Sequence, residues 1–194
     1  MSPFRLMFEQ VVPDMAAEML AALDPASTRN LVMFQDTVTL EQQRFYLERM
    51  KTGLTDMLFV ARSIQETRMI GTIGFHEIDP VHMSARLGLL VFQPKDREQG
   101  YGTEMVQWGL DWAFSKCGLH RVYLSVWFEN AASRILYSRL GFLQEGMRRE
   151  AYRDADGTFH DMVGMAILAS DWRQLVATKK LPSFDQPFRQ ENRS

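Results

Sequence analysis

The clearest chemical signal in this chain of 194 residues lies between Leu87 and Gly102. Apolar residues typical of a strand lead into a charged loop and then into Gly100 and Gly102, where a helix is predicted to begin. The first amide groups of a helix are unpaired and carry partial positive charge, so they can bind an anion such as a pyrophosphate. Lys95 and Arg97 add positive charge, and glycine lets a ligand approach the backbone closely. The segment therefore predicts a phosphate-binding loop, with a plain glycine turn as the alternative.

Asn130 and Tyr137 form a second candidate pair. They are seven residues apart on a predicted helix, which is two turns, so their side chains leave the same side. Asn130 is also a favoured residue for capping the start of that helix. Tyr137 lies off the stripe formed by Ala132, Ile135 and Leu136, which predicts that its hydroxyl reaches a cleft; burial of its ring in the core is the alternative.

Hydrophobic periodicity predicts the elements that position these residues. The expected strands are Phe4–Phe8, Met57–Ser63, Met69–Ile78, Ala85–Phe92, Arg121–Trp127, Met147–Arg153 and Phe159–Leu168. The expected helices are Val12–Leu23, Thr39–Gly53, Gly102–Cys117 and Asn130–Leu140, with a helical turn after Ser170. This order predicts an α+β fold with a mixed, mostly antiparallel central sheet of about seven strands flanked by helices. One domain over residues 1–178 and a polar tail over 179–194 are expected.

Composition narrows the class of protein. With 46% hydrophobic residues, 24% charged residues and a net charge of −2, the chain is typical of a soluble globular protein without a nucleic-acid surface. Its apolar runs are too short for a membrane span, and no leader opens the chain, so a cytoplasmic location is expected. Cys117, the only cysteine, is predicted to pack in the core. A single cysteine cannot form an internal disulfide. The histidines do not have the spacing of metal ligands, so no metal is expected.

Several ordered motifs resemble one enzyme family. The pattern Arg97-x-x-Gly100-x-Gly102 is similar to the acetyl-CoA pyrophosphate loop of the GNAT N-acetyltransferases. Further similar segments are Gly118–Val122, Glu129–Ser133 and Leu136–Phe142. The run Asp156-Gly157-x-x-His160-Asp161 resembles the closing hairpin of the subgroup that contains ribosomal-protein N-terminal and spermidine acetyltransferases. The resemblance covers residues 57–172 and implies the acyl-CoA N-acyltransferase fold.

The resemblance also implies site residues and roles. Acetyl-CoA would be the co-substrate, with its pantetheine arm beside the strand at Leu90 and Val91, where a backbone N–H would also stabilise the oxyanion. Asn130 would bind the arm or cap its helix. Tyr137 would act as the general acid that protonates the departing thiolate, since a neutral phenol can donate a proton. The residues implied for the pyrophosphate are Arg97, Glu98, Gln99, Gly100, Tyr101, Gly102 and Thr103.

The general base and the acceptor are less determined. The acidic residue that relatives often have beside Gly88 is absent here, where the sequence reads Ala85-Arg86-Leu87. The substitute we expect is Glu77. The alternatives are His76, Asp79 and the pair His160 and Asp161.

The resemblance implies direct transfer in a ternary complex to a primary amine: a peptide or protein N-terminus, a polyamine or a small amine. The acceptor would enter between the first two helices and the closing hairpin. Eight acidic against five basic residues in the first sixty slightly favour a cationic acceptor, whereas Arg148, Arg149 and Arg153 oppose it. A non-catalytic acyl-CoA sensor is the rival, which Tyr137 disfavours. The hairpin's edge strand could support a homodimer.

Overall fold

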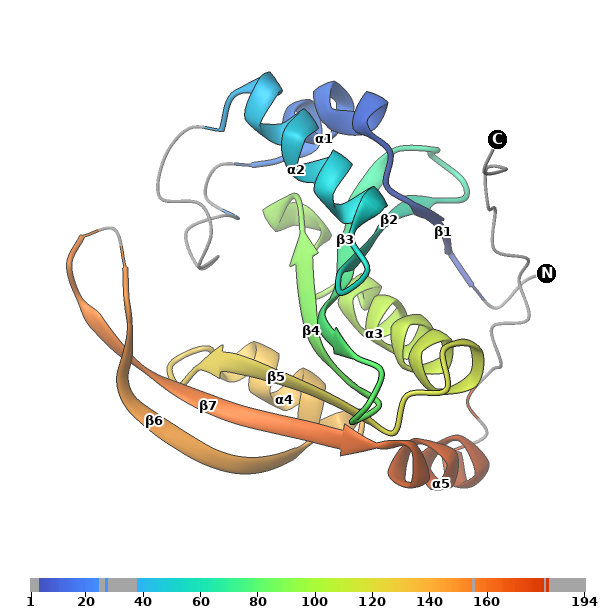
Figure 1. The fold of residues 1–194 in the computed structure, drawn as a ribbon, viewed down its shortest axis with the longest axis vertical. Helices are drawn as coiled ribbons and strands as arrows, with labels where there is room; N and C mark the ends of the chain where they lie inside the picture. Colours follow the sequence, from blue (N-terminus) through green and yellow to red (C-terminus); the bar gives the residue numbers. More distant parts are fainter. Residues whose placement is uncertain (1–3, 25–26, 28–37, 155, 180, 182–194) are drawn as a thin grey trace.

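The computed structural model describes residues 4–24, 27, 38–154, 156–179 and 181. Its centre is one seven-stranded sheet in the order β1-β2-β3-β4-β5-β7-β6 (Figure 1). The strands are β1 Leu6–Gln10, β2 Met57–Ser63, β3 Met69–Asp79, β4 Ser84–Val91, β5 Arg121–Trp127, β6 Leu143–Arg153 and β7 Phe159–Leu168. Neighbouring strands are antiparallel except β4 and β5, which are parallel. The α+β fold with a mixed, mostly antiparallel sheet is therefore confirmed.

Helices cover both faces of the sheet (Figure 1). The α-helices are α1 Ala16–Ala22, α2 Leu40–Thr52, α3 Tyr101–Asp111, α4 Ala131–Arg139 and α5 Ala169–Lys179. Shorter turns of helix are η1 Pro13–Met15, η3 Pro94–Asp96 and η4 Trp112–Lys116, the last of which is a π-helix. The predicted capping box begins α2: Thr39 accepts from the Gln42 amide, and the Gln42 side chain accepts from the Thr39 amide. Among the described residues no helix is long and apolar enough to cross a membrane.

Alternation along the strands divides the core into two layers. On one face, aromatic residues join the sheet to α3: Trp108 stacks on Phe8 with ring centroids 4.1 Å apart. Gly109 lets α3 approach closely, because a Cβ there would lie 2.4 Å from the Ile73 side chain. On the other face, a smaller cluster packs α1 and α2 against β2, including the fully buried Leu47.

Several boundaries differ from the prediction, including those of three elements at the two ends of the chain. β1 begins at Leu6 and β6 begins at Leu143, and the helical turn expected after Ser170 is the eleven-residue helix α5. β6 was underestimated because nearly all of its residues are exposed on the outer edge of the sheet, so it lacks the alternating burial that marks a strand. The predicted tail overlaps the end of α5 at Lys179, and most of it lies outside the described residues.

Two side chains lie where the helical stripes did not predict. Cys117 is exposed, not in the core. The cause is the π-helix before it, where the Cys117 amide donates to the carbonyl of Trp112, five residues back, and so turns the apolar stripe. Tyr137 is buried with 7% of its surface exposed, whereas Ile135 of the supposed core stripe is 51% exposed. The sheet therefore packs against the other side of α4.

Candidate functional site

The sheet opens between β4 and β5. The two strands pair only from Ser84 to Arg86 with Arg121 to Tyr123, and then diverge (Figure 1). The remaining length of β4 keeps its pairing with β3 alone. The Phe92 amide donates to the Ile70 carbonyl of β3, and the direction of the backbone N–H and C=O groups alternates along a strand. The backbone groups of Leu87, Leu89 and Val91 therefore point away from β3, into the gap. Of the two residues predicted beside the cofactor arm, Val91 presents its N–H to the gap, and Leu90 faces β3.

The glycine loop lies between the end of β4 and the start of α3. Gly100 caps the helix with φ of 83°, in the left-handed region that favours glycine, and it offers no capping side chain. The first helical hydrogen bond runs from the Glu104 amide to the Gly100 carbonyl. The amides of Tyr101, Gly102 and Thr103 therefore have no acceptor within the helix. Unpaired amides at the start of a helix can bind an anion such as a phosphate group.

Positive charge at the loop is available for a ligand. Lys95 and Arg97 are exposed, and neither forms an ion pair with any residue that the structure describes. Exposed Glu98, with φ of 59°, and Gln99 lead from Arg97 to Gly100. All the residues predicted to bind the pyrophosphate thus lie on one loop and helix end, beside the gap in the sheet.

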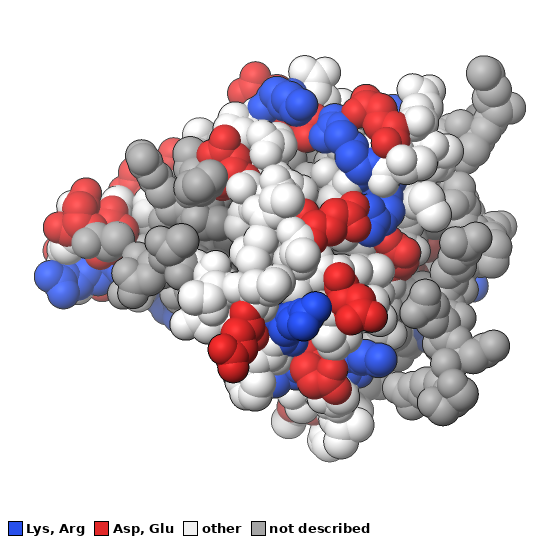
Figure 2. Space-filling model, turned by 90° about the horizontal axis from the view of Figure 1, so that it is seen from above, with Lys and Arg blue, Asp and Glu red and all other residues white. Residues whose placement is uncertain are grey.

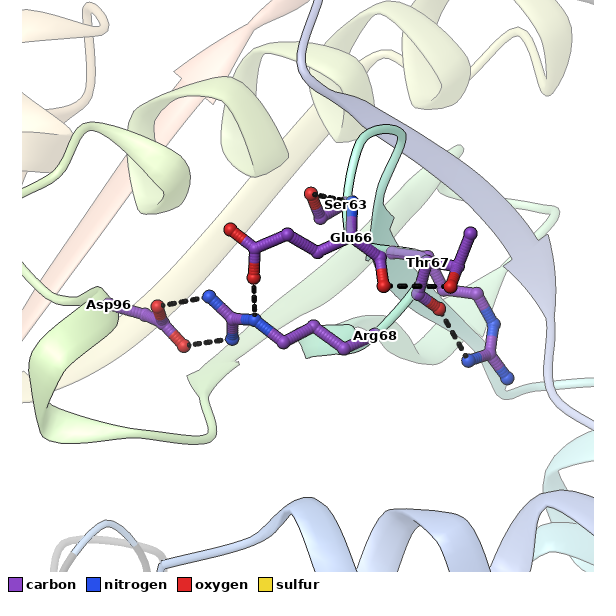
Figure 3. A network of polar contacts seen from close by, with 6 residues as sticks. Ser63, Glu66, Thr67, Arg68 and Asp96 are labelled. Atoms are coloured by element: carbon purple, nitrogen blue, oxygen red, sulfur yellow. Dashed lines mark hydrogen bonds and ion pairs between the residues drawn. The ribbon is translucent and has the colours of Figure 1, made fainter.

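Two arginines that sequence reasoning missed hold this loop in place. Arg68, on the turn before β3, donates to both oxygens of Asp96 at 2.7 and 2.8 Å and also pairs with Glu66 (Figure 3). These contacts, with those to Asp96 the largest cause, raise the pKa of Arg68. Arg5 donates to the Gln99 carbonyl at 2.9 Å and lies over the Tyr101 ring. No local pattern signals these contacts, since the partners are 28 and 94 residues apart.

Helix α4 meets the loop and β4. A Cβ on Gly102 would lie 3.6 Å from Leu136 and 3.7 Å from Leu89. Tyr137 follows Leu136, its ring packs edge-on to Phe142 at 5.4 Å, and its hydroxyl bonds to none of the described residues. Burial raises the pKa of Tyr137, so the phenol is neutral at physiological pH. Asn130 caps α4, because its side chain accepts from the Ser133 amide at 3.1 Å, which leaves its NH₂ group for another contact.

Glu77 lies where the strands begin to diverge. Its two carboxylate oxygens accept hydrogen bonds of 2.8 Å, one from Arg86 of β4 and one from Tyr123 of β5. Arg86 and Tyr123 are the last pair of the β4–β5 ladder, so Glu77 joins three strands at the fork. The Tyr123 bond is the largest cause that lowers the pKa of Glu77. A carboxylate with a lowered pKa is a weaker base, which reduces the support for its predicted role.

The other predicted bases differ in how many of their side-chain nitrogen and oxygen atoms already form hydrogen bonds or ion pairs. His160 stacks on Trp127 at 4.1 Å and pairs with Asp154 and Glu129, and Asp161 accepts from the Glu150 amide. Asp79 is engaged by the His82 side chain and by two backbone amides of its own turn.

His76 is half-buried, and its ring Nδ1 lies 2.9 Å from Asp56 Oδ1. Its Nε2 makes no hydrogen bond with the residues described. Of the predicted bases, it alone combines a fixed ring with a ring nitrogen left open. In residues 4–24, 27, 38–154, 156–179 and 181, no group of three metal-binding side chains occurs.

Comparison with known proteins places this geometry in a family. The model of the acetyltransferase (GNAT) domain matches residues 5–143. A spermidine N(1)-acetyltransferase of Vibrio cholerae is 31% identical over 114 residues, which are 59% of this chain and 64% of that protein. A putative ribosomal N-acetyltransferase, YdaF, of Bacillus subtilis is 26% identical over 141 residues, which are 72% of this chain and 71% of that protein.

A solved structure shares the fold. Spermidine N-acetyltransferase from Vibrio cholerae, in complex with CoA and spermine, superimposes with a TM-score of 0.79 at 21% identity, covering 87% of this chain and 98% of that one. The sheet that opens beside a glycine loop is thus an acyl-CoA N-acyltransferase fold. Since the family model spans most of the described residues, this chain belongs to the GNAT acetyltransferase family.

Proposed function

We propose that this protein transfers the acetyl group of acetyl-CoA directly to a primary amine, with both substrates bound at once. The observation that carries the proposal is the unpaired edge of β4, continuous with the free amides at the start of α3. An extended pantetheine arm can pair with such an edge as an added strand, and the pyrophosphate fits the helix end beside Arg97.

Individual residues take roles within this proposal. Val91 lines the arm and its N–H stabilises the oxyanion, whereas Leu90 offers the arm no backbone group because its own backbone groups face β3. Asn130 keeps its capping bond and offers its NH₂ group to the arm. Tyr137 protonates the departing thiolate, a role supported by the packing of α4 against the loop, whereas the burial that raises the pKa of its phenol makes it a weaker acid. The segment from Arg97 to Thr103 holds the pyrophosphate.

The acceptor is proposed to enter between α1 and α2 and the β6–β7 hairpin. On the face over α1 and α2, positive and negative residues are interspersed (Figure 2), so charge alone selects no acceptor class. The relatives are named for spermidine and for ribosomal proteins, which sets the order of the acceptors to test.

The test is a thiol-release assay with acetyl-CoA against spermidine, basic and neutral N-terminal peptides, aminoglycosides and amino acids. Saturable turnover with one class supports the proposal and identifies the acceptor. Tight acetyl-CoA binding in calorimetry without turnover would instead favour the acyl-CoA sensor. Absence of acetyl-CoA binding would refute the site itself.

Location and assembly complete the proposal. A free, exposed Cys117 fits the reducing cytoplasm. A homodimer through β6 is supported by its place at the sheet edge and by exposed Leu143 and Met147. Light scattering should then give twice the mass of the chain, and Met147→Lys should return a monomer of unchanged fold.

A further inference from the structure

We infer that His76, oriented by Asp56, is the general base that takes the proton from the acceptor amine. The inference rests on the proposed acetyl transfer and supplies the base that this reaction needs, since an ammonium group cannot attack a thioester. It replaces Glu77 in that role.

The position of the His76 ring carries the argument. A Cβ on Gly74 would lie 2.9 Å from His76 Nε2, and a Cβ on Gly88 would lie 3.2 Å from it. These glycines are opposite each other on β3 and β4, so the nitrogen lies over a pair without side chains. Gly88 comes two residues after Arg86, the last residue of β4 that pairs with β5. The imidazole therefore stands beside the place where the sheet opens.

The ring also lies on the side from which the acceptor is proposed to enter. Ile73 and Phe75 point to α3, as their closeness to Gly109 shows. Since side chains alternate along a strand, Gly74 and His76 point to the opposite face, which α1 and α2 cover. A base on that face can meet the amine before it reaches the thioester in the gap.

The hydrogen bond to Asp56 sets the tautomer of the His76 ring. A carboxylate accepts the proton of Nδ1–H, which leaves the lone pair on Nε2. The other groups facing the ring are Arg86 of β4, across from it, and Glu77 beside it on β3, while Tyr46 of α2 faces Asp56. Burial is the largest influence and lowers the pKa of His76, against the opposite effect of Asp56. The imidazole is therefore neutral and able to accept a proton near pH 7.

The proton transfers balance with Tyr137 as the acid. Nε2 of His76 takes one proton from the ammonium group, directly or through one water. The freed amine forms the C–N bond to the thioester carbon, and the C–S bond breaks. The thiolate takes the phenolic proton of Tyr137, and the second proton lost by the nitrogen restores the phenol. The imidazolium then releases its proton to solvent.

The experiment compares pH profiles of kcat/KM with the acceptor identified in the thiol-release assay. In the wild type, kcat/KM should have an acid limb that reports a group titrating below the usual histidine pKa of about 6.5. His76→Gln should lose about 100-fold in kcat/KM near pH 7 and lose this limb. It should recover activity at alkaline pH, where the amine deprotonates unaided. The Kd for acetyl-CoA should stay unchanged.

Three variants separate a base from a structural group. His82→Gln is the matched control, because His82 also pairs with an aspartate, Asp79, at 2.8 Å but has 77% of its side chain exposed. It should keep the wild-type profile. Asp56→Asn leaves the imidazole in place and should lower kcat/KM and shift the acid limb. If His76→Gln fails to fold, this variant tests the inference in its place. Glu77→Gln tests the rival base.

Two outcomes would overturn the inference: a wild-type acid limb in His76→Gln, or loss of that limb in Glu77→Gln instead. Either result would leave the proposed acetyl transfer intact. A wild type that turns over no amine would instead refute the proposed function. The two failures are therefore distinguishable.

Discussion

Replacing Arg68 with glutamine removes both guanidinium hydrogen bonds that hold Asp96 in the proposed phosphate-binding loop. The Asp96 side chain is 5% exposed and that of Arg68 is 31% exposed, so the carboxylate would lose its partner in a largely buried place. Breaking a fully buried pair costs about 3–5 kcal/mol, and the exposure of Arg68 reduces this to about 2 kcal/mol. For a chain of this size the melting temperature should fall by roughly 4–8 °C.

A double-mutant cycle isolates the pair from other effects of Arg68, such as its contact with Glu66. The free energy of unfolding is measured in urea for Arg68→Gln, Asp96→Asn and the double variant, and we expect a coupling of about 2 kcal/mol. Acetyl-CoA should also bind more weakly to Arg68→Gln, because binding must then order the loop. A coupling under about 0.5 kcal/mol, or an unchanged Kd in Arg68→Gln, would refute the reasoning.

Three further predictions test other parts of the site. Tyr137→Phe removes only the hydroxyl, so kcat should fall by about 100-fold while the melting temperature and the Kd for acetyl-CoA stay constant; an unchanged kcat would exclude the acid role. Gly100→Ala adds about 1–2 kcal/mol of backbone strain and a methyl group beside the proposed pyrophosphate site, so calorimetry should show weaker acetyl-CoA binding. Gly118→Ala, also at positive φ but at the far end of that helical segment, is the control and should keep its affinity. His160→Gln tests the hairpin: the pKa of His160 is raised, chiefly by its bond to Asp154, so its stabilising effect is full below pH 6.5 and is lost as pH rises through the raised pKa. The melting temperature of the wild type should therefore exceed that of His160→Gln near pH 5.5 and approach it above pH 8, and a difference independent of pH would contradict this.

Local patterns predicted most elements because each signal lies within one element. The strands Met57–Ser63, Arg121–Trp127 and Phe159–Leu168 have the predicted bounds. The turn between β6 and β7 also follows from its own residues: Asp154 accepts backbone bonds from Asp156 and Thr158, and Gly157 has φ of 96°. These features need no knowledge of the rest of the chain.

Predictions that depended on which side of a helix is buried were less secure. The stripe on α4 pointed to Ile135, yet the sheet buries Tyr137. A short helix carries apolar residues on more than one side, and only its neighbours decide which side becomes the core. For Cys117 the error came from assuming a uniform α-helical period through a segment that contains a π-helix.

The pairing of His76 with Asp56 shows what strand register adds. The two residues are 20 positions apart, and neither is unusual alone. In the β2–β3 ladder Met57 pairs with Phe75, so the next residues outward, Asp56 and His76, lie opposite each other. The β3–β4 ladder then sets Gly74 against Gly88 and opens the space over them that Nε2 occupies. The registers of these two ladders thus place His76 for its proposed role as the base. A one-residue slip in either ladder would turn the paired residues to opposite faces of the sheet.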